Sequence, residues 1–350
     1  LSSLPVIGPS IVHGDQAELG DISADLDYGN IHSYPEGNGP EYKMGSIVER
    51  AKLNSASKPI MATETGYTTA LNWTPAGSGE NRPISEQAMA AYMPRLFFEY
   101  FSRHIARTFA YELVDEHPNP ALDEREDHFG LLRNDLSEKP AFAALSNTIH
   151  ILKDPGPAFT PDPLSYASVG NTANLHQVLL EKRDGTYYLA LWRITSVWDP
   201  IAKEALAAPS EPVTLRFQPG IEATAEYNPV LSPGPVSSFV GSDEPTVEVG
   251  PEVVILKLAP EVEVLPRAVA APLGTLTPAS VARCIVPSLK GRSLTAGRKK
   301  LKKADCRLGR VRGGRAKAGK VRKQSPKPGV LLPPGSRVSV KLGGPESSMG

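Results

Sequence analysis

Lys58-Pro59-Ile60-Met61-Ala62-Thr63-Glu64-Thr65-Gly66-Tyr67 is the most informative stretch of the N-terminal half of the chain. A short run of apolar and β-branched residues ends in a carboxylate, Glu64, and Gly66 follows two residues later. Such a run between turn-forming residues indicates a buried strand. Barrel enzymes place catalytic groups at the carboxyl ends of their strands. Glu64 is therefore the first candidate for a catalytic residue.

Strand-like and helix-like segments alternate along residues 1–155. The strand-like segments are short apolar runs at 4–12, 28–34, 58–64 and 107–113. Helices are predicted at 45–53, 85–103 and 139–152. The evidence is the helical spacing of apolar residues in the second helix and a proline in the first turn of the third. This alternation is typical of an α/β domain with parallel strands.

Residues 165–262 change to a β pattern. Two strand-like runs, 176–182 and 187–193, flank Arg183-Asp184-Gly185-Thr186. An Asp-Gly pair in such a position is a strong hairpin signal. Further β runs follow at 212–217, 223–228 and 246–258. Many short strands separated by turns predict an antiparallel β-sandwich.

The net charge of +0 hides two regions of opposite charge. Residues 1–280 hold 19 Lys and Arg and 36 Asp and Glu, a balance of −17. Residues 281–343 hold 19 Lys and Arg and one acid, Asp305, a balance of +18. This split argues for separate domains with separate functions. Residues 263–280, rich in Pro and Ala, are predicted to form a linker.

The basic region at 281–343 is predicted to be a small α+β module. A helix is expected at 293–304, and short strands are expected at 321–325 and 337–342. The chain's two cysteines, Cys284 and Cys306, both lie in this module. Both a disulfide and a pair of free thiols are open, and we favour the disulfide. Closing a loop of about 20 residues would contribute roughly 3 kcal/mol, and the bond would persist only in an oxidising compartment.

Length and composition limit the number of domains and the classes of protein to which the chain could belong. A chain of 350 residues predicts two or three domains. No apolar run reaches about 18 residues, so no membrane span is expected. No basic segment precedes an apolar one, so no signal peptide is visible, and a start at Leu1 on a strand-like segment suggests a fragment or a processed chain. The His and acidic residues lack the spacing of zinc or calcium loops, so no metal or other cofactor is predicted.

Four short segments of residues 1–155 follow one another in a characteristic order and spacing. They are PVIGPS at 5–10, IHSYP at 31–35, ATETGY at 62–67 and FGLLRNDLSEKPAFAAL at 129–145. Together they resemble the C-terminal half of a (β/α)8 glycoside hydrolase, from the cellulase- and xylosidase-like clan whose retaining members use two glutamates. The resemblance implies a partial TIM-type barrel made of strands five to eight, with the final loop and helix.

The same resemblance assigns roles to single residues. Glu64 would be the nucleophile that attacks the anomeric carbon of the sugar. His32 and Tyr34 would lie beside it, and a hydrogen bond donated by Tyr34 would keep Glu64 ionised. The other residues expected to bind the substrate are Trp73, by stacking on a sugar face, and Tyr111, Glu112 and Asp115, at the end of the eighth strand.

The general acid of such enzymes is a Glu that follows an Asn at the end of the fourth strand. This chain contains no Asn-Glu dipeptide and begins at what resembles the fifth strand. We therefore expect the general acid to lie outside this chain. Simpler interpretations stay open: Glu64 as a solvated strand-end residue, or Trp73 as a packing residue. Glu112 could instead pair with Arg107 or Arg133.

The basic module carries two patterned segments. They are CIVPSLKGRSLTAGRKKLKKADCRLGRV at 284–311 and KVRKQSPKPGVLLPPGSRVSVKL at 320–342. They resemble a PASTA domain, the module of penicillin-binding proteins and serine/threonine kinases that act at bacterial cell walls. The family implies binding to peptidoglycan or an anionic wall polymer. Nucleic acid is disfavoured, because no Phe, Tyr or Trp follows Phe239 and base-stacking platforms are absent.

Two functions from different classes follow. The first is a secreted bacterial glycosidase, a hydrolase of carbohydrate metabolism that cleaves O-glycosidic bonds with retention and associates with the cell wall. The second is a non-catalytic carbohydrate- or wall-binding protein with a decayed barrel. The sugar, the linkage and the oligomeric state are not predicted.

Overall fold

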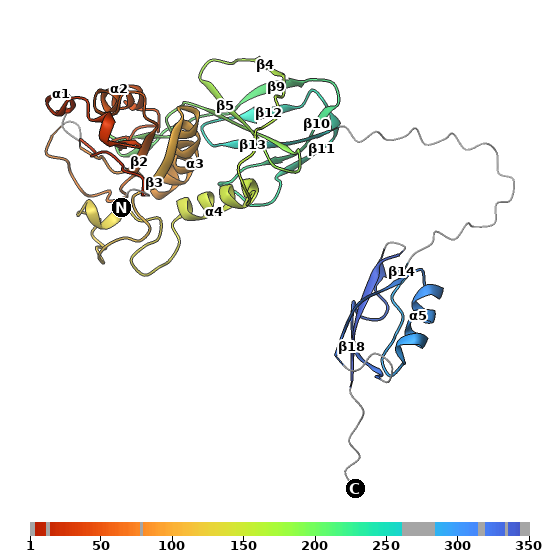
Figure 1. Cartoon of the computed structure of the whole chain (residues 1–350). Helices are drawn as coiled ribbons and strands as arrows, with labels where there is room; N and C mark the ends of the chain where they lie inside the picture. Colours follow the sequence, from red (N-terminus) through yellow and green to blue (C-terminus); the bar gives the residue numbers. More distant parts are fainter. Residues whose placement is uncertain are drawn as a thin grey trace, which may run out of the picture. The chain divides into compact units, whose positions relative to one another are not determined.

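The computed structural model describes residues 4–11, 15–77, 80–260, 284–313, 319–332 and 335–343. The chain divides into two compact units, unit 1 (residues 1–263) and unit 2 (residues 264–350), so the protein is multidomain (Figure 1). The predicted linker at 263–280 lies outside the described residues. In the described part of the chain, no helix has the length and apolarity needed to cross a membrane.

A three-stranded parallel sheet organises the first part of unit 1. Its order is β1 (Gly29–His32), β2 (Ile60–Thr65) and β3 (Ile105–Ala110). The strand expected at 4–12 is reduced to one isolated parallel bridge from Ile7 to Tyr28 over its described residues. No sheet of the described residues closes into a barrel, and the partial TIM-type barrel is not confirmed.

Three helices form close to their predicted positions: α2 (Met44–Ser55), α3 (Glu86–Ser102) and α4 (Pro140–Leu152). The Ser85 hydroxyl caps α3 by accepting from the Ala88 amide at 3.1 Å. Pro140 opens α4, where its missing amide proton costs no hydrogen bond. Shorter helical turns are α1 (Gln16–Leu19), η1 (Ser23–Asp25) and η2 (Glu126–His128).

Two antiparallel sheets follow in unit 1, with orders β11-β10-β13-β6-β5 and β12-β9-β4. Their strands are β4 (Tyr166–Gly170), β5 (Leu175–Glu181), β6 (Tyr187–Arg193), β9 (Glu211–Phe217), β10 (Ile221–Tyr227), β11 (Ser237–Ser242), β12 (Thr246–Val249) and β13 (Val254–Pro260), beside a small pair, β7 (Trp198–Asp199) and β8 (Glu204–Ala205). The predicted hairpin joins β5 to β6, with Gly185 at φ +79° in its turn. Leu189 and Leu256 of one sheet pack with Val213 and Val247 of the other in a shared apolar core.

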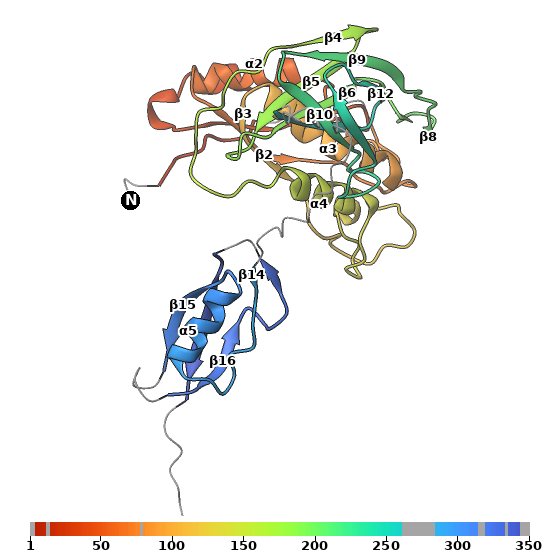
Figure 2. The ribbon, with the colours of Figure 1, turned by 90° about the vertical axis from the view of Figure 1, so that its right-hand side faces the viewer.

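Helix α3 lies between the parallel sheet and the five-stranded sheet (Figures 1 and 2). Its Met89 and Leu96 pack in the core with the parallel strands, while its Phe98 packs against Trp192 of β6. A buried polar contact joins the same elements, because the Glu99 carboxylate accepts from Trp192 Nε1 at 2.8 Å. The helix therefore joins the parallel and antiparallel parts into one body.

Unit 2 pairs one helix with a mixed sheet of order β15-β18-β16 (Figure 2). Its elements are β14 (Cys284–Ile285), α5 (Leu294–Lys303), β15 (Arg307–Arg312), β16 (Val321–Ser325), β17 (Leu331–Leu332) and β18 (Arg337–Leu342). Leu301 of α5 packs on Val338 and Val340 of β18. The Cys284–Cys306 disulfide is present, which confirms that prediction. The predicted helix and both predicted strands of this module are found.

Candidate functional site

Glu64 lies at the carboxyl end of β2, and the parallel register pairs it with His32 at the end of β1. Its Oε2 atom accepts a hydrogen bond from the Tyr34 hydroxyl at 3.0 Å and lies 3.2 Å from His32 Nδ1. The side chain is 38% exposed, against 23% for His32. No hydrogen bond within the described residues reaches Oε1. Glu64 is thus held by one oxygen and presents the other.

The His32 ring is fixed from its far side. Its Nε2 atom contacts Thr63 Oγ1 at 2.8 Å, and this hydroxyl in turn donates to Asn30 Oδ1 at 2.8 Å. Thr63 and Glu64 are neighbours on β2, while Asn30 and His32 lie two residues apart on β1. Side chains at alternate positions of a strand share a face. Asn30 therefore supports His32 from the same strand, a role that sequence analysis missed.

Tyr34 is a hydrogen-bond donor in a partly apolar setting. Burial, and then the Glu64 carboxylate, hold the pKa of Tyr34 well above its usual value of 10, so its hydroxyl stays protonated. Its ring packs edge-on against Phe129, with 5.6 Å between centroids, and against Tyr111 at 6.4 Å. These contacts fix the direction in which the hydroxyl points.

Gly66 allows the next strand to approach the site. A Cβ atom at this position would lie 2.2 Å from the Tyr111 carbonyl oxygen, so only glycine fits. The Tyr111 amide donates to the Thr65 carbonyl at 2.8 Å. Tyr111 and Glu112 directly follow β3, and this contact places them beside the end of β2.

Glu112 is a second carboxyl group at this end of the sheet. Burial raises the pKa of Glu112 to about 7, and the nearby carboxylates of Glu116, Asp115 and Glu126 act in the same direction. Its Oε1 atom is buried and has no hydrogen-bond partner within the described structure. Arg133, one of the partners considered for Glu112, forms its salt bridge with Glu86 instead.

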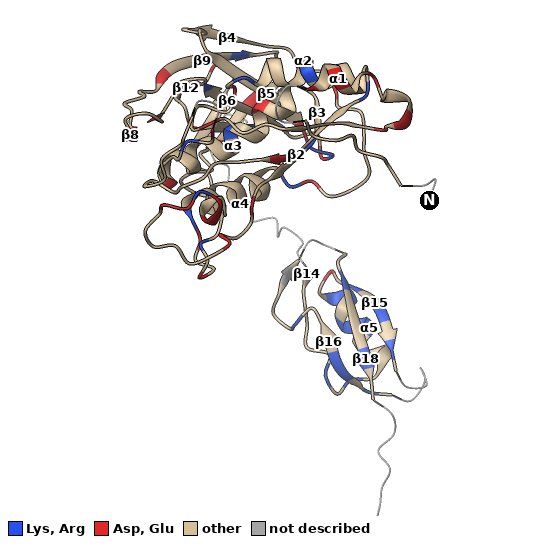
Figure 3. Ribbon diagram, turned by 90° about the vertical axis from the view of Figure 1, so that its left-hand side faces the viewer, with Lys and Arg blue, Asp and Glu red and all other residues tan. Residues whose placement is uncertain are grey.

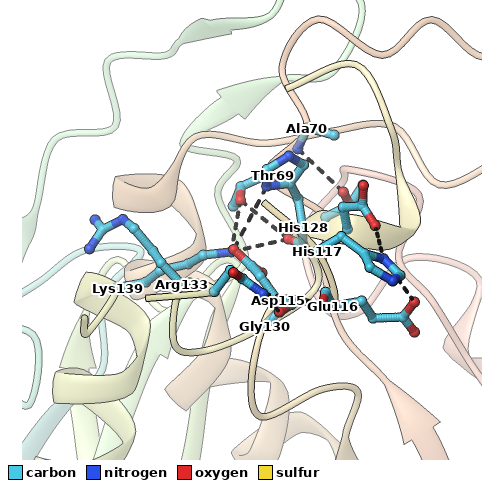
Figure 4. Close-up of polar contacts among 12 residues, drawn as sticks. Thr69, Ala70, Asp115, Glu116, His117, His128, Gly130, Arg133 and Lys139 are labelled. Atoms are coloured by element: carbon cyan, nitrogen blue, oxygen red, sulfur yellow. Dashed lines mark hydrogen bonds and ion pairs between the residues drawn. The ribbon is translucent and has the colours of Figure 1, made fainter. Parts of the chain in front are cut away.

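Asp115 faces the interior rather than an open surface (Figure 4). Its Oδ1 atom accepts from Lys139 Nζ at 2.7 Å and from the Gly130 amide at 2.8 Å. The side chains are 1% exposed for Lys139 and 5% for Asp115. Through these contacts Asp115 holds the loop after β3 in place. We therefore do not include Asp115 among the residues that could bind a sugar.

Trp73 is half-buried and already has a partner on its ring. The Arg125 guanidinium lies 5.2 Å from the ring centroid, and the Lys203 ammonium donates to the Trp73 carbonyl at 2.8 Å. Its stacking on a sugar stays a prediction. A cation on one ring face leaves the other face for such a contact.

Glu116 and His117, on the loop after β3 (Figure 4), come together with Asp127 of η2, and one possible ligand atom from each residue lies within 4.8 Å of the others. His117 Nδ1 lies 2.8 Å from Asp127 Oδ1 and 3.9 Å from Glu116 Oε2. Sequence spacing gave no sign of this group, because ten residues separate His117 from Asp127. The atoms could hold a divalent cation, but all three side chains also have ordinary polar roles, and we assign no metal.

A cavity of about 690 Å³ opens beside β1. Its lining includes Asn30, His32 and Tyr34 from the region of β1, with Lys43 and Arg50 on the helical side. This volume is typical of sites that hold small organic ligands. Two of the residues that contact Glu64 thus also face an open cavity.

Solved structures with some likeness to the chain are carbohydrate-active enzymes. A family 39 glycoside hydrolase from Bacteroides cellulosilyticus WH2 is 16% identical with a TM-score of 0.43, over 67% of this chain and 44% of that one. A family 17 β-1,3-glucanosyltransferase from Rhizomucor miehei is 21% identical with a TM-score of 0.31, over 40% and 50%. A β-glucuronidase from Ruminococcus gnavus is 20% identical with a TM-score of 0.28, over 39% and 24%. The chain spans less than half of the length of the family 39 enzyme.

No curated protein matches the chain. A family model does match its C-terminal part, at residues 285–344, and that family is the PASTA domain. The match begins one residue after Cys284 and covers Cys306, α5 and the three-stranded sheet of unit 2, in agreement with the resemblance found in the sequence. Residues 285–344 of this chain are therefore a PASTA domain.

Proposed function

We propose that unit 1 belongs to a retaining glycosidase that hydrolyses O-glycosidic bonds with Glu64 as its nucleophile. The observation that carries the proposal is the arrangement of Glu64. Tyr34 and His32 both contact Oε2, at 3.0 and 3.2 Å, and Oε1 is left for attack. A carboxylate oriented in this way suits bond formation with an anomeric carbon.

The reaction would proceed in two steps. Glu64 Oε1 forms a bond to the anomeric carbon while the bond from that carbon to the leaving oxygen breaks, and the leaving oxygen takes up a proton. Water then forms a bond to the anomeric carbon while the bond from that carbon to Glu64 Oε1 breaks, which restores the carboxylate; the proton that water loses returns to the group that protonated the leaving oxygen. The hydrogen bond from Tyr34 orients Glu64 before the first step, and Glu112 and Tyr111 are proposed to bind sugar hydroxyls. The general acid is left unassigned.

The PASTA domain suggests association with the bacterial cell wall. The Cys284–Cys306 disulfide supports a location in an oxidising compartment, outside the cytoplasm. We propose that the protein is secreted and that unit 2 keeps it at the wall, where unit 1 meets its polysaccharide.

Activated glycosides test the nucleophile without depending on the general acid. A dinitrophenolate leaves without protonation, so a panel of dinitrophenyl 2-deoxy-2-fluoroglycosides can trap the glycosyl-enzyme. We expect a mass increase of one glycosyl group on the peptide that contains Glu64. We expect no increase for Glu64→Gln, and a normal increase for Glu49→Gln, an exposed control on α2.

Turnover of the unfluorinated glycosides gives a graded readout. Glu64→Gln should lower kcat on the order of 10⁴-fold or more. Tyr34→Phe should lower it roughly 10- to 100-fold, because a hydrogen bond to a charged group contributes about 1.5–3 kcal/mol. Labelling at another carboxyl group would overturn the assignment. Sugar binding without labelling or turnover, across the panel, would favour the non-catalytic binding protein.

A further inference from the structure

The outer face of the unit 2 sheet carries a cluster of cations. On β18, Val338 and Val340 point into the core, while Arg337 and Lys341 point outward and are exposed. The neighbouring strands add outward cations, so the face contains Arg310, Arg312, Lys323, Arg337 and Lys341. We call these five residues the basic face. Helix α5 packs on the opposite side of the sheet, through Leu301.

The strand register places like charges directly beside one another. Lys341 of β18 pairs with Arg312 of β15 on one side and with Lys323 of β16 on the other. These three cations form a row across all three strands, about 5 Å from strand to strand. Arg337 likewise pairs with Arg307. Like charges in cross-strand pairs destabilise a sheet, so folding alone does not explain this row.

No salt bridge is formed among the residues of unit 2 that the structure describes. Its one acid among residues 281–343, Asp305, follows α5 and is exposed. Figure 3 shows the contrast: the charged segments of this unit are almost all blue (Lys and Arg), whereas unit 1 carries both blue and red segments. The basic face therefore presents a positive field that the unit does not neutralise itself.

The basic face is hollowed. A groove of about 680 Å³ runs over it, lined by all five cations of the basic face and by small residues that include Gly309, Ser325 and Ser339. Small side chains at the floor let a ligand approach the sheet, while long basic chains stand at its sides. Arg and Lys in such positions match phosphate oxygens, Arg through its paired N–H groups.

We propose that this groove binds a linear polymer of phosphodiesters, and that this polymer is the wall component that unit 2 recognises. The inference rests on the proposed wall association. Charge must supply the binding energy, because residues 240–350 contain no aromatic ring on which a sugar or a base could stack. A neutral glycan and a nucleic acid both favour such rings, whereas a phosphodiester chain needs only spaced cations.

The test compares two triple variants of the full chain with the same change in charge. Arg312→Gln/Lys323→Gln/Lys341→Gln removes the row on the sheet. Arg298→Gln/Lys299→Gln/Lys302→Gln removes one Arg and two Lys that are exposed on α5. Binding to poly(glycerol phosphate) is measured by calorimetry at several salt concentrations, with circular dichroism and intact mass to verify folding and the disulfide.

We expect the sheet variant to bind roughly 100-fold more weakly, about fivefold for each cation lost. The slope of log K against log salt should fall by about 2, for three contacts. The helix variant should bind within about threefold of wild type. Its three cations act on the polymer only by long-range attraction, and salt screens that attraction. Equal losses of affinity in both variants would overturn the assignment of binding to the groove, since the total charge of the unit would then explain the binding.

Two further probes separate the alternatives. Tighter binding of single-stranded DNA than of poly(glycerol phosphate), at equal phosphate number, would overturn the proposal in favour of nucleic acid. Binding of uncharged glycan strands that survives in the sheet variant would overturn it in favour of sugar recognition. Hydrolysis of glycosides is expected to be unchanged in both triple variants. The glycosidase assay therefore tests the function proposed for unit 1, and the polymer assay tests the groove of unit 2 independently of it.

Discussion

The two units use charge in opposite ways. In unit 1, some cations are fully buried and each of these has a carboxylate partner: Lys139 pairs with Asp115 at 2.7 Å, and Arg95 pairs with Glu41 at 2.6 Å. In unit 2, the described Lys and Arg side chains are largely exposed, and none of them forms a salt bridge with Asp305, the one acid among the described residues of this unit. A buried pair fixes local geometry, whereas exposed like charges sum to a field. Single substitutions should therefore matter most in unit 1, and groups of substitutions in unit 2.

The pKa values in unit 1 show how each buried ion depends on its partner. Burial lowers the pKa of Lys139, and the Asp115 carboxylate opposes that change. Burial alone would raise the pKa of Glu99, but hydrogen bonds from His176 and Trp192 hold it below its usual value. Removal of one partner leaves the other ion buried without compensation.

The largest effect on stability is expected for Lys139→Met. The change removes the ammonium group that neutralises the buried Asp115 carboxylate and that also donates to the Thr69 hydroxyl and the His128 carbonyl. It should lower the free energy of unfolding of unit 1 by roughly 3–5 kcal/mol. Urea denaturation followed by tryptophan fluorescence measures this, because all three tryptophans lie in unit 1.

Two controls sharpen that measurement. Lys153→Met removes an exposed lysine just after α4 and should cost less than about 0.5 kcal/mol. The double variant Lys139→Met/Asp115→Leu should recover much of the loss, because no buried charge remains. A loss in the double variant equal to that of Lys139→Met would show that packing, and not the pair, is responsible.

Unit 2 depends on its covalent link more than on any ion pair. Cys284→Ser/Cys306→Ser opens a loop with a sequence separation of 22 and should destabilise this unit by about 3 kcal/mol. Hydrogen exchange followed by mass spectrometry should show faster exchange in α5 and β18 and unchanged exchange in β2. Slower folding or faster exchange in both units would contradict the prediction, since the stabilities of the two units would then not be independent.

The smallest effect concerns the dependence of unit 1 stability on pH. Glu112 has a pKa of about 7 when folded, above the value of 4.5 for a free carboxyl group, so the folded state binds its proton more tightly. The stability from this proton is complete below about pH 4.5 and is lost as the pH rises through 7. Solvent reduces the change to on the order of 1 kcal/mol.

Glu112→Gln should remove this pH dependence and stabilise unit 1 at pH 8 relative to wild type. Urea midpoints at pH 5.5 and pH 8 measure the change, and Glu124→Gln, an exposed acid on the same loop, serves as the control. A midpoint difference between the two pH values that persists in Glu112→Gln would assign the effect to another group.

Local patterns in the sequence predicted many of the elements. The Asp184-Gly185 pair gave the β5–β6 hairpin, and helical spacing gave α3. Strands β4 and β11 were missed, because each lies at the edge of its sheet and neither carries a clear apolar alternation. The run at 246–258 was predicted as one strand and forms two, β12 and β13, with Pro251 between them. Proline has no amide proton for a sheet ladder.

The sequence by itself determined the parts of this protein that depend on neighbours along the chain. Glu64 at a strand end, the cysteines and the charge of the basic module are of this kind. Only the tertiary structure decided which distant residues meet: Tyr34 and His32 on one oxygen of Glu64, Asp115 on Lys139, and Arg312, Lys341 and Lys323 in one row. Strand register and helix packing set these contacts, and both arise from burial of side chains that lie far apart in sequence.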